Sequence, residues 1–364
     1  MAQIPPSLHW RQLISRLFYM LLCLHLTVAA ARQALARSPD IEDGLLATIE
    51  IDVVDNRVHV PMMVNGIRYT LLLDTGASSS ILFGDTASSA SIDLDGEQIA
   101  VSFPAFMAVG EGRRLKEVTY RAGAFRFTSA RTIYVENRSA ISNKITLKFD
   151  GVLGREFFER HIVEIDASAK TMRLFAPGTK IGRRFRYRRP IMMDGGTPYL
   201  LHRSKLPWET RRTAKKLLLD TGYPGGVAFW NQTYFRQATS PAERARLREE
   251  NKGVLYFGVI GFGKLLFRNM PVFLSPNSPS KIDNRDGIIG AALFLPFSYA
   301  IDFSAKNLWL APRVTSAGIG YQISNDVIYT PGDEDFVVKD YAPRASLVPK
   351  HTLHGDTVVT PDQQ

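Results

Sequence analysis

The stretch LLLDTGASSS, residues 71–80, leads three leucines into an aspartate and then turns at a glycine. Its first six letters return at residues 217–222. Burying a carboxylate costs on the order of several kcal/mol unless another group compensates for the lost hydration. Because the chain accepts this cost twice, we expect its two aspartates, Asp74 and Asp220, to act together.

A second repeat is longer and indicates an internal duplication. DGVLGREFFERHIVEIDASAKTMRL starts at Asp150, DGIIGAALFLPFSYAIDFSAKNLWL starts at Asp286, and the two align without a gap. Each half of the chain therefore carries the same two blocks in the same order. Such self-similarity is typical of two copies of one structural unit.

Local patterns predict a mainly β protein. Residues 59–74 and 254–274 are rich in β-branched and aromatic side chains, and Asn65-Gly66 is a hairpin turn signal. One helix is clearly predicted. It follows the capping-box pattern Ser240-Pro-Ala-Glu243 and should end at Gly253.

The chain is long enough for two domains. It has 364 residues, of which 45% are hydrophobic and 22% charged, close to the globular average. We expect two similar lobes, residues 45–180 and 191–313. A basic linker, 181–190, should join them, and a tail, 314–364, should follow.

The formal net charge of +10 raises the question of an anionic partner. Part of the excess lies in five arginines of the linker: Arg183, Arg184, Arg186, Arg188 and Arg189. A nucleic-acid patch is one interpretation and a solvated linker is the other. No zinc-finger spacing or RNA-binding signature supports the first, so we expect a linker and no nucleic-acid partner.

The N-terminal region has the layout of an export signal. Arg11 and Arg16 precede or border the apolar run at residues 17–31, and no acidic residue occurs before Asp40. A basic start followed by an apolar core is typical of a signal peptide. The run is shorter than the about 20 residues that a membrane span needs.

AAA at residues 29–31 and ALA at 34–36 suit signal cleavage after Ala31 or after Ala36. Residues 1–36 are therefore predicted as a signal peptide, with an uncleaved N-terminal anchor as the alternative. We expect an exported protein, periplasmic or secreted, that meets a membrane only if the anchor is kept. Cys23 is the only cysteine and lies in this segment. The mature chain would therefore have no disulfide and no thiolate metal site.

Two Asp-Thr-Gly turns related by a pseudo-twofold axis would bring their carboxylates face to face. Like charges a few ångströms apart share one proton and titrate as a unit. Such a pair can accept a proton from water and donate one to a carbonyl oxygen. Gly76 and Gly222 would let the two backbones approach, and Thr75 and Thr221 would hydrogen-bond across the axis.

Asp-Thr-Gly-Ala-Ser after an apolar strand, followed by an apolar-apolar-Gly element, resembles the retropepsin-type aspartic proteases. The resemblance spans roughly residues 45–313 and implies a bilobal acid-protease fold with an active-site cleft between two pseudo-twofold-related lobes. It implies catalysis by Asp74 and Asp220 without metal or organic cofactor, in a chain that can act as a monomer. The implied loop-supporting residues are Thr75, Gly76, Ala77, Ser78, Thr221 and Gly222. The implied loop-stiffening residues are Val152, Leu153, Gly154, Ile288, Ile289 and Gly290.

The second loop departs from the family pattern. It continues with Tyr223 and Pro224, where the first loop has Ala77 and Ser78. Hairpins that close over a bound peptide favour glycine at their tips, because a mobile hairpin takes unusual backbone dihedral angles. The candidates for such flaps are the segments 108–112 and 256–263.

The repeats contain two further symmetric pairs of acids. Asp150 and Asp286 also form a pair, but each precedes a glycine without an apolar strand leading into it. Asp166 and Asp302, in the repeated Ile-Asp-x-Ser-Ala-Lys, are predicted to form hairpin turns with the lysines that follow.

The segment GVIGFGK, residues 258–264, resembles a phosphate-binding loop but continues with Leu265 in place of Ser or Thr, so we expect no nucleotide site. The tail contains Gly-Ile-Gly-Tyr, residues 318–321, which faintly resembles a truncated PDZ domain, and a partly ordered tail is the other interpretation.

The sequence therefore predicts an aspartic endopeptidase that hydrolyses an extended polypeptide through a water held between two aspartates. The alternative is a non-catalytic peptide-binding protein on the same bilobal fold.

Overall fold

The computed structural model describes residues 44–84, 96–103, 108–136, 148–204, 206, 208–230, 232–249, 253–262, 265–274, 285–295, 297–312, 336–339 and 357–359. From Leu46 onward these residues belong to one unit of the chain. The predicted signal peptide, residues 1–36, lies outside the described residues. Among the described residues, no helix combines the length and the apolar character needed to cross a membrane.

A ten-stranded sheet contains the first LLLDTG. Its strands are β2 (Asp52–Val54), β3 (Arg57–Val64), β4 (Ile67–Leu73), β5 (Ile81–Phe83), β6 (Glu97–Phe103), β7 (Ala108–Arg114), β8 (Val118–Ala122), β9 (Phe125–Ser129), β10 (Ile133–Val135) and β11 (Gly151–Leu153). Over the described ranges their order is β6-β7-β10-β5-β11-β4-β3-β8-β9, with β2 paired to β3. Asn65 and Gly66, at φ 48° and 89°, turn the β3–β4 hairpin, which confirms that prediction.

A nine-stranded sheet contains the second LLLDTG. Its strands are β15 (Met192–Asp194), β16 (Thr197–Ser204), β17 (Thr213–Asp220), β18 (Val227–Phe229), β19 (Gly253–Phe262), β20 (Leu265–Leu274), β21 (Gly287–Gly290), β24 (Phe336–Lys339) and β25 (Thr357–Val359). In the part of the chain that is described, their order is β15-β16-β17-β21-β18-β20-β19-β24, with β25 paired to β20. The rest of the tail lies outside the described residues, so its PDZ-like character stays a prediction.

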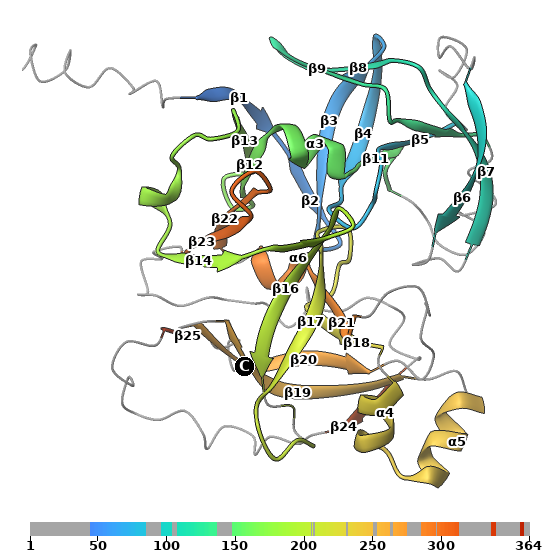
Figure 1. The fold of residues 1–364 in the computed structure, drawn as a ribbon, viewed down its shortest axis with the longest axis vertical. Helices are drawn as coiled ribbons and strands as arrows, with labels where there is room; N and C mark the ends of the chain where they lie inside the picture. Colours follow the sequence, from blue (N-terminus) through green and yellow to red (C-terminus); the bar gives the residue numbers. More distant parts are fainter. Residues whose placement is uncertain are drawn as a thin grey trace, which may run out of the picture. The chain divides into compact units, whose positions relative to one another are not determined.

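A six-stranded sheet combines strands from both repeats. Its strands are β1 (Leu45–Glu50), β12 (Ile162–Asp166), β13 (Thr171–Phe175), β14 (Tyr187–Pro190), β22 (Phe297–Asp302) and β23 (Asn307–Pro312). Among the described residues the order is β1-β13-β12-β22-β23-β14. Strands β12, β22, β23 and β14 can be followed in this order in Figure 1. The antiparallel pair β12–β22 sets Val163 opposite Ile301, so equivalent blocks of the two repeats meet at the centre of this sheet.

The two hairpins of this sheet turn at the repeated Ile-Asp-x-Ser-Ala-Lys. Asp166 Oδ1 accepts the N–H of Ala169 at 3.0 Å, and Asp302 Oδ1 accepts that of Ala305 at 2.9 Å. Lys170 and Lys306 take positive φ angles of 51° and 53°. The predicted hairpin turns are confirmed.

The helices in the described part of the chain are short. They are α3 (Arg155–Arg160), α4 (Gln232–Ala238), α5 (Pro241–Glu249) and α6 (Ala291–Phe294). Ser240 Oγ accepts the N–H of Glu243 at 3.2 Å, as the capping box predicted, but α5 ends at Glu249 and Gly253 begins β19. Helices α3, α4 and α6 were not predicted, because one or two turns are too short to show a helical period.

The basic stretch expected as a linker is an ordered part of the six-stranded sheet. It forms the 3-10 turn η3 (Gly182–Arg184) and the strand β14, in which Tyr187 is buried between exposed arginines. This alternation has the period of a strand with one face toward the core. The strand was not predicted because its arginines made the stretch look like a solvated linker. Long arginine stems can nevertheless pack on aromatic rings, and the Arg184 guanidinium lies 5.0 Å from the ring centre of Phe175.

Each LLLDTG strand faces two apolar layers. Leu71 and Leu73 are fully buried in the main core, whereas Leu72 joins a smaller cluster with Val152. Side chains alternate along a strand, so Asp74 continues on the face of Leu72. The main core therefore fixes the strand from one side, and the aspartate emerges on the other.

Candidate active site

The two aspartates occupy equivalent places in the two larger sheets. β4 runs parallel to β11 with Leu73 opposite Leu153, and β17 runs parallel to β21 with Asp220 opposite Gly290. The N–H of Asp74 donates to the carbonyl of Leu153 at 3.0 Å. The elements Val152-Leu153-Gly154 and Ile288-Ile289-Gly290 thus lie beside the strands that end in the aspartates.

The two threonines join the loops through four hydrogen bonds. Thr75 N–H donates to Thr221 Oγ1 and Thr221 N–H donates to Thr75 Oγ1, each at 3.1 Å. The Thr75 hydroxyl donates to the carbonyl of Leu219 at 2.7 Å, and the Thr221 hydroxyl donates to that of Leu73 at 2.8 Å. Both threonines are fully buried, where hydrogen bonds are little weakened by water. This exchange fixes the distance between the loops.

Each aspartate is held by its own loop. Asp74 Oδ1 accepts the N–H groups of Gly76 and Ala77 at 2.7 and 3.2 Å. Asp220 Oδ1 accepts those of Gly222 and Tyr223 at 2.9 and 3.0 Å. Backbone donors therefore fix the Oδ1 atom of each carboxyl group.

The glycines bring each loop against the opposite carboxyl group. A Cβ on Gly222 would stand 2.4 Å from Asp74 Cγ, and one on Gly76 would stand 2.6 Å from Asp220 Cγ. Real Cβ atoms do not approach so closely. Only glycine fits here because of this contact; no unusual backbone angle is involved.

The carboxyl groups share a hydrogen bond and perturb each other's ionisation. Burial raises the pKa of Asp74, and the hydrogen bond from Asp220 opposes that rise. The pKa of Asp220 lies well above its ordinary value, first through burial and then through the negative charge of Asp74. Neighbouring carboxylates behave in this way when they hold one proton between them.

The bulky Tyr223 of the second loop is accommodated by two glycines. A Cβ on Gly225 would stand 2.6 Å from the Tyr223 hydroxyl, and one on Gly290 would stand 2.5 Å from Tyr223 Cδ1. The ring therefore lies over both backbones, and the N–H of Tyr223 still donates to Asp220. The departure of DTGYPGG from the first loop leaves the hydrogen bonds at its aspartate intact.

The second loop is one residue longer than the first. Val152 pairs with Ile81, seven residues after Asp74, whereas its counterpart Ile288 pairs with Ala228, eight residues after Asp220. The small apolar cluster around Leu72 consequently has a counterpart in the second half that is built from side chains of different size. It contains Tyr199, Leu218, Ala228 and Ile288.

The second symmetric pair of acids lies at the other end of the same strands. Asp150 Oδ2 accepts the N–H of Thr70 at 2.9 Å, and Asp286 Oδ2 accepts that of Lys216 at 2.8 Å. Each acid therefore fixes the strand register four residues before Asp74 or Asp220. This role accounts for the repeated Asp-Gly without catalysis.

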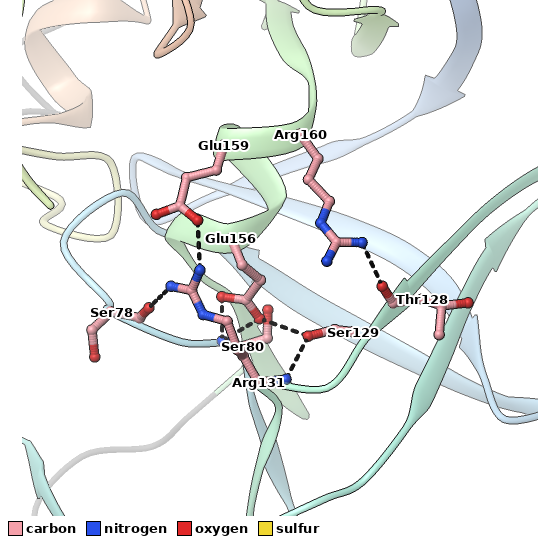
Figure 2. A network of polar contacts seen from close by, with 8 residues as sticks. All are labelled: Ser78, Ser80, Thr128, Ser129, Arg131, Glu156, Glu159 and Arg160. Atoms are coloured by element: carbon pink, nitrogen blue, oxygen red, sulfur yellow. Dashed lines mark hydrogen bonds and ion pairs between the residues drawn. The ribbon is translucent and has the colours of Figure 1, made fainter.

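A network of polar side chains holds the first loop, and sequence reasoning missed it (Figure 2). Arg131 donates to the carbonyl of Ser78 at 3.2 Å and is ion-paired with Glu159. Glu156, almost fully buried, accepts the N–H of Ser80 with both of its oxygens. The aligned repeats could have indicated Glu156, because the second copy has Ala292 at the equivalent position.

The described part of the chain contains no group of three His, Cys, Asp or Glu side chains placed to hold a metal ion. The segment 258–262 of the rejected phosphate-loop match lies within β19.

Comparison with known protein families finds a match. A family model described as aspartyl protease covers residues 60–157. The match supports a protease. It contains the Asp74 loop and β11, whereas Asp220 lies outside it. No curated protein matches the chain.

Proposed function

We propose that the protein is a single-chain aspartic endopeptidase of retropepsin type, in which Asp74 and Asp220 form the catalytic dyad. The ten-stranded and nine-stranded sheets would be its two lobes, and the six-stranded sheet would join them. The observation that carries the proposal is the reciprocal hydrogen bonding of Thr75 and Thr221. It places two carboxyl groups in contact, and each is set against the glycine of the other loop.

The chemistry follows from a dyad that holds one proton. The ionised carboxylate takes a proton from a water molecule, whose oxygen attacks the peptide carbonyl carbon. The protonated carboxyl group donates its proton to the carbonyl oxygen, which gives a gem-diol. The gem-diol then transfers a proton back to one carboxylate, the other carboxyl group protonates the leaving nitrogen, and the C–N bond breaks. The dyad ends with one proton, as it began.

An extended polypeptide is the substrate that fits this site best. The small clusters on the faces of Leu72 and Leu218 are apolar, so we expect apolar side chains on both sides of the cleaved bond. Ala228 stands where the first half has Ile81, so the two sides would differ in the size they accept.

Two hairpins are candidates for flaps over the substrate. The segment 108–112 lies in β7, which pairs with β6, and residues 256–262 lie in β19, which pairs with β20. Residues 104–107 and 263–264, which connect these strands, lie outside the described residues. The basic and apolar N-terminal layout supports export to the periplasm or beyond. Both aspartates lie in one chain, so a monomer suffices for activity.

The test is cleavage of a diverse peptide mixture between about pH 3 and pH 7, the range over which a carboxylate dyad titrates. We expect Asp74→Asn and Asp220→Asn each to abolish cleavage. The matched controls Asp150→Asn and Asp286→Asn change acids of the same symmetric kind and should keep it. Cleavage that survives Asp220→Asn would overturn the shared dyad. A folded wild-type protein that binds peptides without cleaving them would favour the peptide-binding alternative.

A further inference from the structure

The loop that carries Asp74 is anchored at its far end by a buried carboxylate. Glu156 in α3 is 2% exposed, and its two oxygens accept the N–H of Ser80 at 2.9 and 3.0 Å. Ser129 Oγ donates to the same carboxylate at 3.4 Å (Figure 2). A buried charge is tolerated only where such donors replace water. The donors here come from the loop and from the end of β9.

The start of α3 connects this anchor to Asp74. The N–H of Gly154 donates to Ser80 Oγ at 3.0 Å, and the N–H of Arg155 donates to the carbonyl of Ala77 at 2.9 Å. Ala77 in turn donates its own N–H to Asp74 Oδ1. A continuous series of hydrogen bonds therefore runs from the helix to the catalytic carboxylate.

The second half keeps the backbone part of this arrangement and lacks the carboxylate. Gly290 N–H donates to the carbonyl of Gly226 at 2.8 Å, and Ala291 N–H donates to that of Tyr223 at 2.9 Å. Ala292 occupies the place of Glu156 and is buried. The anchoring carboxylate is thus specific to the loop of Asp74.

We propose that Glu156 is a positioning residue that holds Ser80 and thereby keeps the N–H groups of Gly76 and Ala77 on Asp74. The inference deepens the proposed function and rests on it for its kinetic readout. Among the described residues, Arg155 from its own helix and Tyr120 from β8 interact electrostatically with Glu156, and neither belongs to the dyad.

Loss of the anchor has a consequence that loss of stability alone does not have. N–H groups that donate to a carboxylate favour its ionised form. If the loop moves and these donors withdraw, the first ionisation of the dyad shifts to higher pH. A residue that only supports folding would lower the melting temperature and leave this ionisation unchanged.

The experiment compares Glu156→Ala and Glu156→Gln with the wild type, with Glu164→Ala as the matched control. Glu164 is also a buried glutamate, but its partners are Arg184 in η3 and Arg173 in β13. Two readouts are taken: kcat and KM across the acid pH range, and titration of the aspartate carboxyl carbons by NMR, assigned with the Asp74→Asn and Asp220→Asn variants.

For Glu156→Ala we expect kcat to fall about tenfold with little change in KM, as for a group that acts through catalytic geometry. The acid limb of the kcat–pH profile and the midpoint of the NMR titration should both shift to higher pH by roughly half a unit, the size of shift expected when a hydrogen-bond donor is lost. Glu156→Gln keeps one acceptor oxygen for Ser80 and should show a smaller shift in the same direction. Glu164→Ala should lower the melting temperature without either shift.

A folded Glu156→Ala protein with an unchanged dyad titration would overturn the positioning role. If that variant does not fold, an unchanged titration in Glu156→Gln overturns it equally. A wild-type protein that cleaves nothing would count against the proposed peptidase, while the NMR titration would still decide the role of Glu156.

Discussion

Gly76 of the first loop lies directly against the carboxyl group of Asp220 in the second. A Cβ at this position would stand 2.6 Å from Cγ and 2.7 Å from Oδ2 of that aspartate. The neighbour is fixed by its own backbone hydrogen bonds at Gly222 and Tyr223, so it cannot move aside. The two loops can therefore approach this closely only because each has a glycine, without a side chain, at this position.

We predict that Gly76→Ala removes peptidase activity by at least about a hundredfold, because a displacement of about 1 Å at the reacting groups has an effect of that order. Gly222→Ala should do the same. The measurement is kcat/KM on a cleaved peptide, with circular dichroism to check folding. Gly123→Ala is the control: Gly123 has φ +58° and open space around it, so the change strains a turn without touching the site. Equal activity losses in Gly76→Ala and Gly123→Ala would contradict the steric explanation.

A second prediction concerns stability at the dyad. The folded-state pKa of Asp220 is raised, so the folded state binds its proton more tightly than the unfolded state does. Stability is therefore lost as pH rises from the unfolded value near 4 through the folded value. Asp220→Asn removes the ionisation, and its amide oxygen can still accept the N–H of Gly222.

We therefore expect Asp220→Asn to be more stable than wild type at pH 7, by about 1.4 kcal/mol for each unit by which burial and Asp74 raise the pKa. The advantage should disappear near pH 3, where the wild-type carboxyl is protonated in both states. Urea unfolding at the two pH values measures the difference. Asp150→Asn serves as control, since its carboxylate accepts the N–H of Thr70 far from the dyad. An advantage of the same size at both pH values would count against a shared proton.

The sequence predicted the local features of this site better than its long-range ones. LLLDTG and its repeat predicted two equivalent aspartates, and Asn65-Gly66 predicted a hairpin, because both depend on a few adjacent residues. The pairing of β12 with β22 was not predicted, since the register between distant strands is set by the packing of the whole core. Glu156 was missed because it is one of four charged residues in the six-residue helix α3 and its partner Ser80 is distant in sequence.

The basic stretch supplies the last prediction, because it was expected to be solvated and is instead attached to the sheet. Arg184 is ion-paired with Glu164 at 2.6 Å, and Arg173 lies 3.6 Å from the same carboxylate. Burial raises the pKa of Glu164, and Arg184 opposes that rise. Removing the arginine leaves a largely buried carboxylate with its more distant partner only.

We expect Arg184→Ala to lower the free energy of unfolding by about 1–3 kcal/mol, below the usual cost of breaking a fully buried pair because Arg184 is partly exposed. Arg183→Ala, an exposed neighbour in the same turn, should change it by less than about 0.5 kcal/mol. The double variant Arg184→Ala with Glu164→Gln should recover part of the loss, because no buried charge is then left unpaired. If urea unfolding shows equal small effects for both single arginine variants, the stretch is no more than the solvated linker that its composition suggested.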